Sequence, residues 1–75
     1  MTKAARSVIL FFSSNHAIWA ARLLEEKGIQ ARLVPTPKQL SSECGHAVEL
    51  AACEADAGAD ALRARGVPFD RVAGL

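Results

Sequence analysis

Two alanine-rich segments with helical periodicity set the strongest limit on how this 75-residue chain can fold. The first begins at a cap, Ser14 or Asn15, and continues up to Gly28, while the second covers about residues 52–65 and stops at Gly66. A glycine directly after a helix readily takes the left-handed conformation that ends it. The chain therefore contains two helices, and the segments around them decide the fold class.

Four short apolar segments flank these helices. They cover residues 7–12, 29–34, 46–50 and 67–72. β-branched and aromatic residues dominate the first, and the second alternates apolar with polar positions, so both are typical of strands. Pro68 places the last segment at a sheet edge, because proline cannot donate to a β ladder. The order predicts an α+β, ferredoxin-like βαββαβ two-layer sandwich with an antiparallel sheet, as one domain over residues 1–75 with 1–6 flexible.

Composition excludes several classes of function. Fifteen of the apolar residues are alanine, which leaves few large side chains for a core and favours docking to a partner or a homodimer. A net charge of +1 and only three Phe, one Trp and no Tyr argue against nucleic-acid binding. The longest apolar run, residues 8–12, is far shorter than the roughly 20 residues of a membrane span. It is also too short for a signal-peptide core, which has about 7–15 apolar residues.

The two cysteines and two histidines have no metal-binding spacing. Cys44 and Cys53 are nine residues apart, which is not a disulfide framework, so we expect a cytoplasmic protein with reduced thiols. His16 and His46 do not form the short ligand pairs that zinc needs, and no metal site is expected. Both histidines are expected at the surface or in capping roles.

The predicted topology brings three connections to one end of the sheet. They are the turn at residues 13–16, the loop at residues 35–45 and the turn at Gly66. Cys44 would then lie near the N-terminus of the first helix, where free amides and the helix dipole lower the pKa of a thiol. His16 and Asn15 are the candidates to stabilise its thiolate. The alternative, a Cys44 that is a small buried core residue, stays open.

The loop at residues 35–45 has the composition of a segment that presents a nucleophile. Prolines stiffen it, a lysine adds positive charge, serines supply hydroxyl groups, and a glycine lets another chain approach closely. The residues with these roles are Pro35, Pro37, Lys38, Ser41, Ser42 and Gly45. Glu43 would oppose a thiolate. Cys53, at the opposite end, is expected to be a buried filler, and Trp19 and Phe69 to be core or interface residues.

The same loop resembles a family signature. It reads Pro35-Thr36-Pro37-Lys38-Gln39-Leu40-Ser41-Ser42-Glu43-Cys44-Gly45-His46-Ala47. The small Se/S carrier protein-like domains show P-x-P-[RK]-x-[IL]-S-x-x-C-G-x-A between their second and third strands. Residues that also fit the family's first strand and helix are 11–14, Ala17, Ala20, Leu23, Leu24, Gly28 and Ile29. The likeness covers most of the chain through Ala47.

The resemblance implies a carrier rather than a stand-alone enzyme. Cys44 would hold sulfur or selenium as a persulfide or perselenide, received from a donor such as a cysteine desulfurase and passed to an acceptor protein. No cofactor beyond the covalently carried atom is implied. Lys38 stands where Arg is common, and Glu43 stands where a small residue is frequent. The alternative function is a non-catalytic ferredoxin-like interaction or regulatory module that dimerises or docks on a partner.

Overall fold

Over residues 5–38, 40 and 45–74, which the computed structural model describes, the chain forms strands and α-helices in the predicted order β-α-β-β-α-β. The elements are β1 (Arg6–Leu10), α1 (Ser14–Glu26), β2 (Ala31–Pro35), β3 (His46–Ala51), the short 3₁₀ turn η1 (Ala52–Glu54), α2 (Ala55–Ala64) and β4 (Arg71–Gly74). Residue 6, expected in a flexible segment, is the first residue of β1, and the Ala5 carbonyl accepts a hydrogen bond from the Ala52 amide at 2.9 Å.

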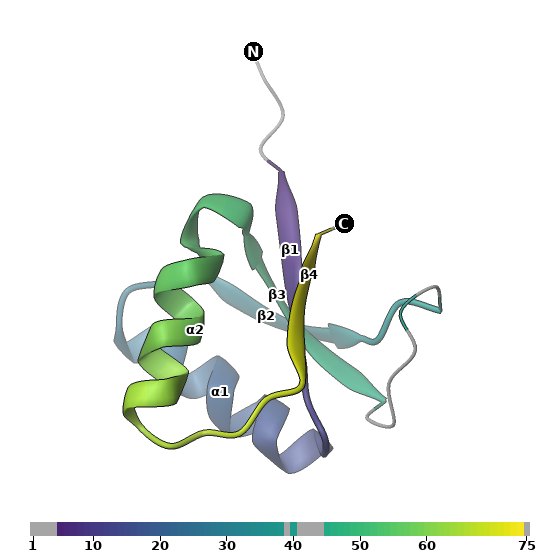
Figure 1. Ribbon diagram of the computed structural model, residues 1–75, viewed down its shortest axis with the longest axis horizontal. Coiled ribbons are helices and arrows are strands. Elements are labelled where there is room, and N and C mark those ends of the chain that lie inside the picture. Colours follow the sequence, from purple (N-terminus) through teal and green to yellow (C-terminus); the bar gives the residue numbers. More distant parts are fainter. Residues whose placement is uncertain (1–4, 39, 41–44, 75) are drawn as a thin grey trace.

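The strands form one sheet in the order β2-β3-β1-β4, and every neighbouring pair is antiparallel. Both helices lie on the same side of this sheet (Figure 1). This is the ferredoxin-like two-layer sandwich that the sequence predicts. β4 lies at an edge, as Pro68 indicated. Leu10, the last residue of β1, pairs with Ala47 on β3 and with Arg71 on β4.

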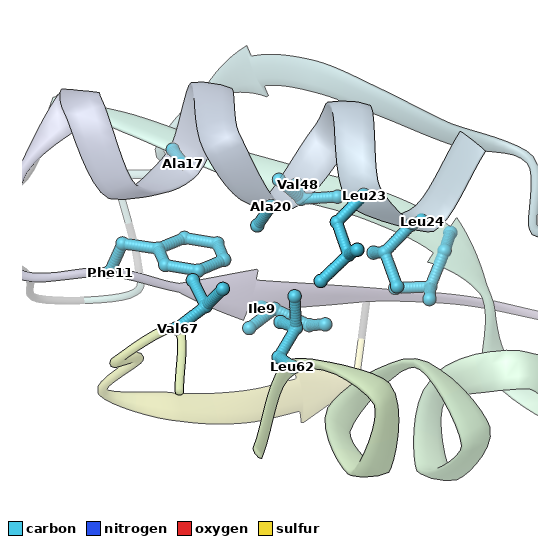
Figure 2. Close-up of a cluster of buried hydrophobic side chains, with 10 residues drawn as sticks. Ile9, Phe11, Ala17, Ala20, Leu23, Leu24, Val48, Leu62 and Val67 are labelled. Carbon is cyan, nitrogen blue, oxygen red and sulfur yellow. The ribbon is translucent and has the colours of Figure 1, made fainter. Parts of the chain in front are cut away.

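The main core fills the space between the helices and the sheet. Alternate residues of a strand point to opposite faces, so Ile9 of β1 and Val48 and Leu50 of β3 face the helices. Helix side chains on one face of each helix cover them. The buried residues of this cluster are Ile9, Phe11, Ala17, Ala20, Leu23, Leu24, Val48, Leu50, Leu62 and Val67 (Figure 2). Ala17, Ala20 and Leu24, which recur at helical spacing, lie on the core face of α1, and Ala21 is partly buried against the same cluster.

A second, smaller apolar cluster lies on the other face of the sheet. Val8 and Leu10 of β1 and Ala47 of β3 are fully buried there. Partly buried residues pack against them, including Val34 at the end of β2 and Leu40 from the β2–β3 connection. The connection therefore contributes an apolar anchor to the sheet face that the helices leave uncovered.

Ser13 caps α1, one or two residues earlier than predicted. Its backbone is extended, with φ −149° and ψ 154°, and its hydroxyl accepts a hydrogen bond from the His16 amide at 3.4 Å. This is the bond that a capping serine makes to the third helical residue. The prediction of Ser14 or Asn15 is wrong, since Ser14 is already in the first turn.

Both helices end in a Schellman motif, and this moves two strands from their predicted positions. Gly28 and Gly66 have φ values of +82° and +73°. The amides of the following residues, Ile29 and Val67, donate to the carbonyls of Leu24 and Leu62, both at 2.9 Å.

The residue after such a glycine usually makes an apolar contact with the helix. For this reason Val67 is buried in the main core and Ile29 is partly buried against it, although neither residue lies in a strand. The predicted strands 29–34 and 67–72 therefore begin too early, and the structure has β2 at 31–35 and β4 at 71–74. Phe12, expected in the first strand, lies beyond its end and is 56% exposed.

Candidate functional site

Three connections meet at one end of the sheet, as the predicted topology requires. β1 ends at Leu10, beside the start of β3 and the start of β4. The Asp70 amide, just before β4, donates to the Leu10 carbonyl at 2.6 Å. The β1–α1 turn, the base of the β2–β3 connection and the segment entering β4 are therefore neighbours.

A side-chain hydrogen bond joins α1 to β3 at this end. Ser14 Oγ lies 3.2 Å from His46 Nδ1, across 32 residues of sequence. Ser14 is in the first turn of α1, and His46 is the first residue of β3. His46 shares the helix-facing side of β3 with Val48 and Leu50, which brings its ring to the helix although the residue is exposed.

The base of the β2–β3 connection is closed by backbone pairing. Pro35 of β2 lies opposite His46 of β3, and one residue further on the Thr36 amide donates to the Gly45 carbonyl at 3.1 Å. The Leu40 amide donates to the Pro37 carbonyl at 3.0 Å. Both arms of the connection are thus fixed at the sheet end, and Leu40 packs on the face opposite the helices.

The predicted loop residues divide into described and undescribed positions. Lys38 and Gly45 are exposed, Pro35 ends β2 with an exposed side chain, and Pro37 is partly buried. The remaining positions of the predicted site that fall in this loop lie outside the described residues; they are Ser41, Ser42, Glu43 and Cys44. The role of Cys44 stays a prediction. The structure shows that the base of the connection in which Cys44 lies is closed by backbone pairing.

Of the two imidazoles at this end, the structure connects His46 and not His16. His16 Nδ1 is buried and has no hydrogen-bond partner among the described residues, while Asn15 is exposed. Neither residue is linked by a side-chain bond to the base of the β2–β3 connection in the described part of the chain. The role assigned to these two residues stays a prediction. The signal that identifies His46 is the alternation of His46, Val48 and Leu50 on one face.

Cys53 is exposed in η1, so its predicted role as a buried filler is wrong. Cys53 lies two residues after Ala51, and Ala51 pairs with Arg6 at the start of β1. Cys53 therefore lies at the end of the sheet opposite the β2–β3 connection, as predicted. Trp19 is 45% exposed and is not a core residue. Phe69 is partly buried against the core, with the Arg63 guanidinium 5.3 Å from its ring centroid.

The described residues hold no group of three or more His, Cys, Asp or Glu side chains that could bind a metal ion. Along the same residues, no helix has the length and apolar character needed to cross a membrane.

The fold and the closed connection define a small ferredoxin-like domain whose candidate site lies at the β2–β3 end of its sheet. The family described as "Putative Se/S carrier protein-like" matches residues 6–73, and the chain belongs to this family. No curated protein and no solved structure matches the chain. The resemblance inferred from the loop motif is therefore confirmed at the level of the family.

Proposed function

We propose that this protein is a carrier that holds sulfane sulfur or selenium on Cys44 and transfers it to an acceptor protein. The observation that carries the proposal is the family match across residues 6–73. The geometry adds a connection whose described flanks, Lys38 and Gly45, are exposed to an approaching protein. A cytoplasmic location, where thiols stay reduced, belongs to the same proposal.

The chemistry requires a thiolate and two exchange steps. In loading, the Cys44 thiolate attacks the outer sulfur of a donor persulfide, and the bond between the donor's two sulfur atoms breaks. The electron pair of that bond leaves with the donor cysteine as a thiolate, and the outer sulfur, with its proton, becomes the Cys44 persulfide. In delivery, an acceptor thiolate attacks the outer sulfur of that persulfide and Cys44 leaves as a thiolate. A perselenide follows the same balance with selenium as the outer atom.

The first prediction tests this assignment by intact mass under non-reducing conditions. After incubation with a cysteine desulfurase and cysteine, the wild-type protein is expected to gain a single chalcogen atom that reductant removes. Cys44→Ser is expected to gain none while keeping the wild-type far-UV circular dichroism spectrum. The matched control is Cys53→Ser, which removes the other, exposed thiol and should load as the wild type does.

Two results would contradict the carrier assignment. If Cys44→Ser still gains the atom, a residue other than Cys44 carries it. Loading lost on Cys53→Ser, or a disulfide between the two cysteines during turnover, would indicate a resolving-thiol mechanism instead.

A non-catalytic interaction module is the second candidate, and exposed apolar side chains favour it. Phe12, Ile18 and Trp19 are 56%, 42% and 45% exposed, and all three lie in or just before α1. Exposed apolar side chains that gather on one element are typical of surfaces that contact another protein. The two candidates differ in one measurement, because only the carrier needs a Cys44 that reacts with a thiol reagent in the native protein.

A further inference from the structure

We propose that two copies of this chain pair along β2, so that the sheet of one copy continues into the other around a two-fold axis at Leu33. β2 is an edge strand, and among the described residues no strand lies on its outer side. The free edge of a sheet offers amides and carbonyls to another strand. This inference uses no property of Cys44 and is independent of the proposed function.

The outward-pointing backbone groups of β2 follow from its pairing with β3. The pair formed by Thr36 and Gly45 is hydrogen-bonded, because the Thr36 amide donates to the Gly45 carbonyl at 3.1 Å. Bonded and non-bonded pairs alternate along an antiparallel ladder, so the backbone groups of Ala31, Leu33 and Pro35 point away from β3. Proline has no amide hydrogen, and at this position it costs β2 no bond to β3.

The residues of β2 select one antiparallel register with a second copy. With Leu33 opposite Leu33, the two leucines exchange two hydrogen bonds, and each Ala31 amide can donate to the Pro35 carbonyl of the other copy. A register centred on Arg32 would place two like charges directly opposite each other. A register centred on Val34 would pair Leu33 with Pro35, which cannot donate. The register centred on Leu33 avoids both costs.

This register also aligns the segments on either side of β2. The residues that follow β2 in one copy run beside the residues that precede β2 in the other, because the strands are antiparallel. Counting outward from Leu33, Lys38 of one copy comes opposite Gly28 of the other. Gly28 lies directly after the C-terminal end of α1. Pairing at Leu33 therefore brings Lys38 toward that helix end.

The C-terminal end of α1 is suited to a cation from outside the chain. Glu25 and Glu26 are exposed in its last turn, which holds no basic residue, and Lys27 at the C-cap offsets only one of the two charges. The negative end of the helix dipole adds to this charge. Neither these glutamates nor Lys38 forms an ion pair in the described part of the chain. Because the axis repeats the contact, each copy supplies a lysine to the acidic helix end of the other.

The apolar contribution is small and favours β2 over the other edge strand. Leu33 shares the helix-facing side of the sheet with Val48, yet it is 42% exposed, and pairing would cover it. Val72 of β4 is 38% exposed, but its flanking charges, Asp70 and Arg71, already pair with each other. Two five-residue strands are small beside the roughly 1,200–2,000 Å² of a stable interface. The dimer is therefore expected to form at high concentration, and dilute protein is expected to be monomeric.

The test is sedimentation velocity of the full chain over a concentration series that reaches the millimolar range. Reducing buffer prevents disulfides between cysteines. The wild-type chain should shift from monomer to dimer as its concentration rises, and about 1 M salt should weaken the dimer by screening its charges. Leu33→Lys should abolish the dimer, because a charged edge side chain blocks strand pairing. The matched control is Val72→Lys on β4, which should associate as the wild type does.

Charge reversal tests the register. Lys38→Glu should raise the dissociation constant of the dimer about tenfold, and so should Glu25→Lys combined with Glu26→Lys. Exposed ion pairs are weak singly, but the two-fold axis repeats each contact, and reversal replaces attraction with repulsion. All three changes together should restore the wild-type constant. Arg65→Glu, the same charge change at the exposed C-cap of α2, should leave the constant unchanged.

Several results would overturn this proposal. A wild-type chain that stays monomeric at every concentration would exclude the pairing. A dimer that survives Leu33→Lys, or one that Val72→Lys abolishes, would move the contact away from β2. A triple charge variant as weak as the separate reversals would overturn the register. If Leu33→Lys does not fold, as judged by far-UV circular dichroism, the charge reversals at exposed positions still decide.

Discussion

Among the described residues, neither the backbone conformation nor the packing around Gly45, which directly follows the proposed carrier cysteine, requires a glycine. Its φ is not in the left-handed region, unlike that of Gly66, and a Cβ built on it meets no described atom within 4 Å. The residue is exposed at the closed base of the β2–β3 connection. The absence of a side chain there fits the expectation that the backbone of a donor or acceptor protein comes close to Gly45, as the proposed transfer requires.

The substitution Gly45→Ala is predicted to separate stability from protein-to-protein transfer. The free energy of unfolding should stay unchanged or rise by about 0.4–1 kcal/mol, because alanine restricts the unfolded chain. Loading from a desulfurase should slow, while loading from glutathione persulfide should keep its wild-type rate. Denaturant unfolding and the two loading assays measure these effects. The control is Gly74→Ala, because Gly74 also has open space and, unlike Gly28 and Gly66, no φ in the left-handed region. Equal slowing with both donors would show that Gly45 serves the loop itself.

At the scale of single residues, sequence reasoning identified the end of the sheet but not the side chain that connects there. His16 lies on the helix and next to the turn, so proximity along the sequence favoured it over His46. The contact with Ser14 depends on the face of β3 to which His46 belongs and on where α1 packs over that face. The alternation of His46, Val48 and Leu50 gives the face, but the position of the first turn of α1 above His46 depends on helix-to-sheet packing, which the sequence pattern does not give.

At the scale of elements, the order and type of the four strands and two α-helices among the described residues were predictable, and several boundaries were not. Ile29 and Val67 are apolar because each contacts the helix that has just ended, and a reading by strand periodicity includes such residues in the next strand. Cys53 shows the same limit, since the predicted second helix begins with the 3₁₀ turn η1, in which this side chain is exposed. Local hydrogen bonding at helix ends thus shifted boundaries without changing the topology.

The N-terminal cap of α1 gives a prediction at this scale. Ser13→Ala removes the hydroxyl that accepts from the His16 amide, and should lower the free energy of unfolding by about 1 kcal/mol. Asn15→Ala, at an exposed position that sequence reasoning also considered for the cap, should change it by no more than about 0.5 kcal/mol. Urea unfolding followed by circular dichroism compares the two. A larger loss for Asn15→Ala than for Ser13→Ala would restore the original assignment of the cap.

At the scale of the whole molecule, the main core lies between the helices and the sheet, and the candidate site lies at one end of the sheet. The helices and one sheet face bury the main cluster, whereas Leu40 of the β2–β3 connection packs with Val8, Leu10 and Ala47 on the other face. His46 bonds α1 on the helix side of the sheet, and Leu40 packs on the opposite side. The β2–β3 connection therefore contacts both faces of the sheet at one end. Substitutions in this connection can therefore change the site while the packing of the main core stays the same.

This arrangement predicts that two leucines contribute very differently to the free energy of unfolding, depending on whether each lies in the main core. A domain of this size has a free energy of unfolding of about 4–11 kcal/mol, so a single core position matters greatly. Leu24 of α1 is fully buried in the main core, and Leu33 of the edge strand β2 is 42% exposed. Leu24→Ala should cost about 2–5 kcal/mol, because the deleted atoms leave a cavity. Leu33→Ala, the same chemical deletion, should cost no more than about 1 kcal/mol.

Thermal unfolding distinguishes these costs, since each kcal/mol shifts the melting temperature by about 4–8 °C in a domain of 60–100 residues. Leu24→Ala is therefore expected to lower the midpoint by at least about 8 °C, and Leu33→Ala by less than about 8 °C. A tight dimer or a partner that docks on the edge strand β2 would instead make Leu33→Ala as costly as Leu24→Ala, with a midpoint that depends on protein concentration. Equal, concentration-dependent losses would thus contradict a core confined to one chain and support the interaction module over the free carrier.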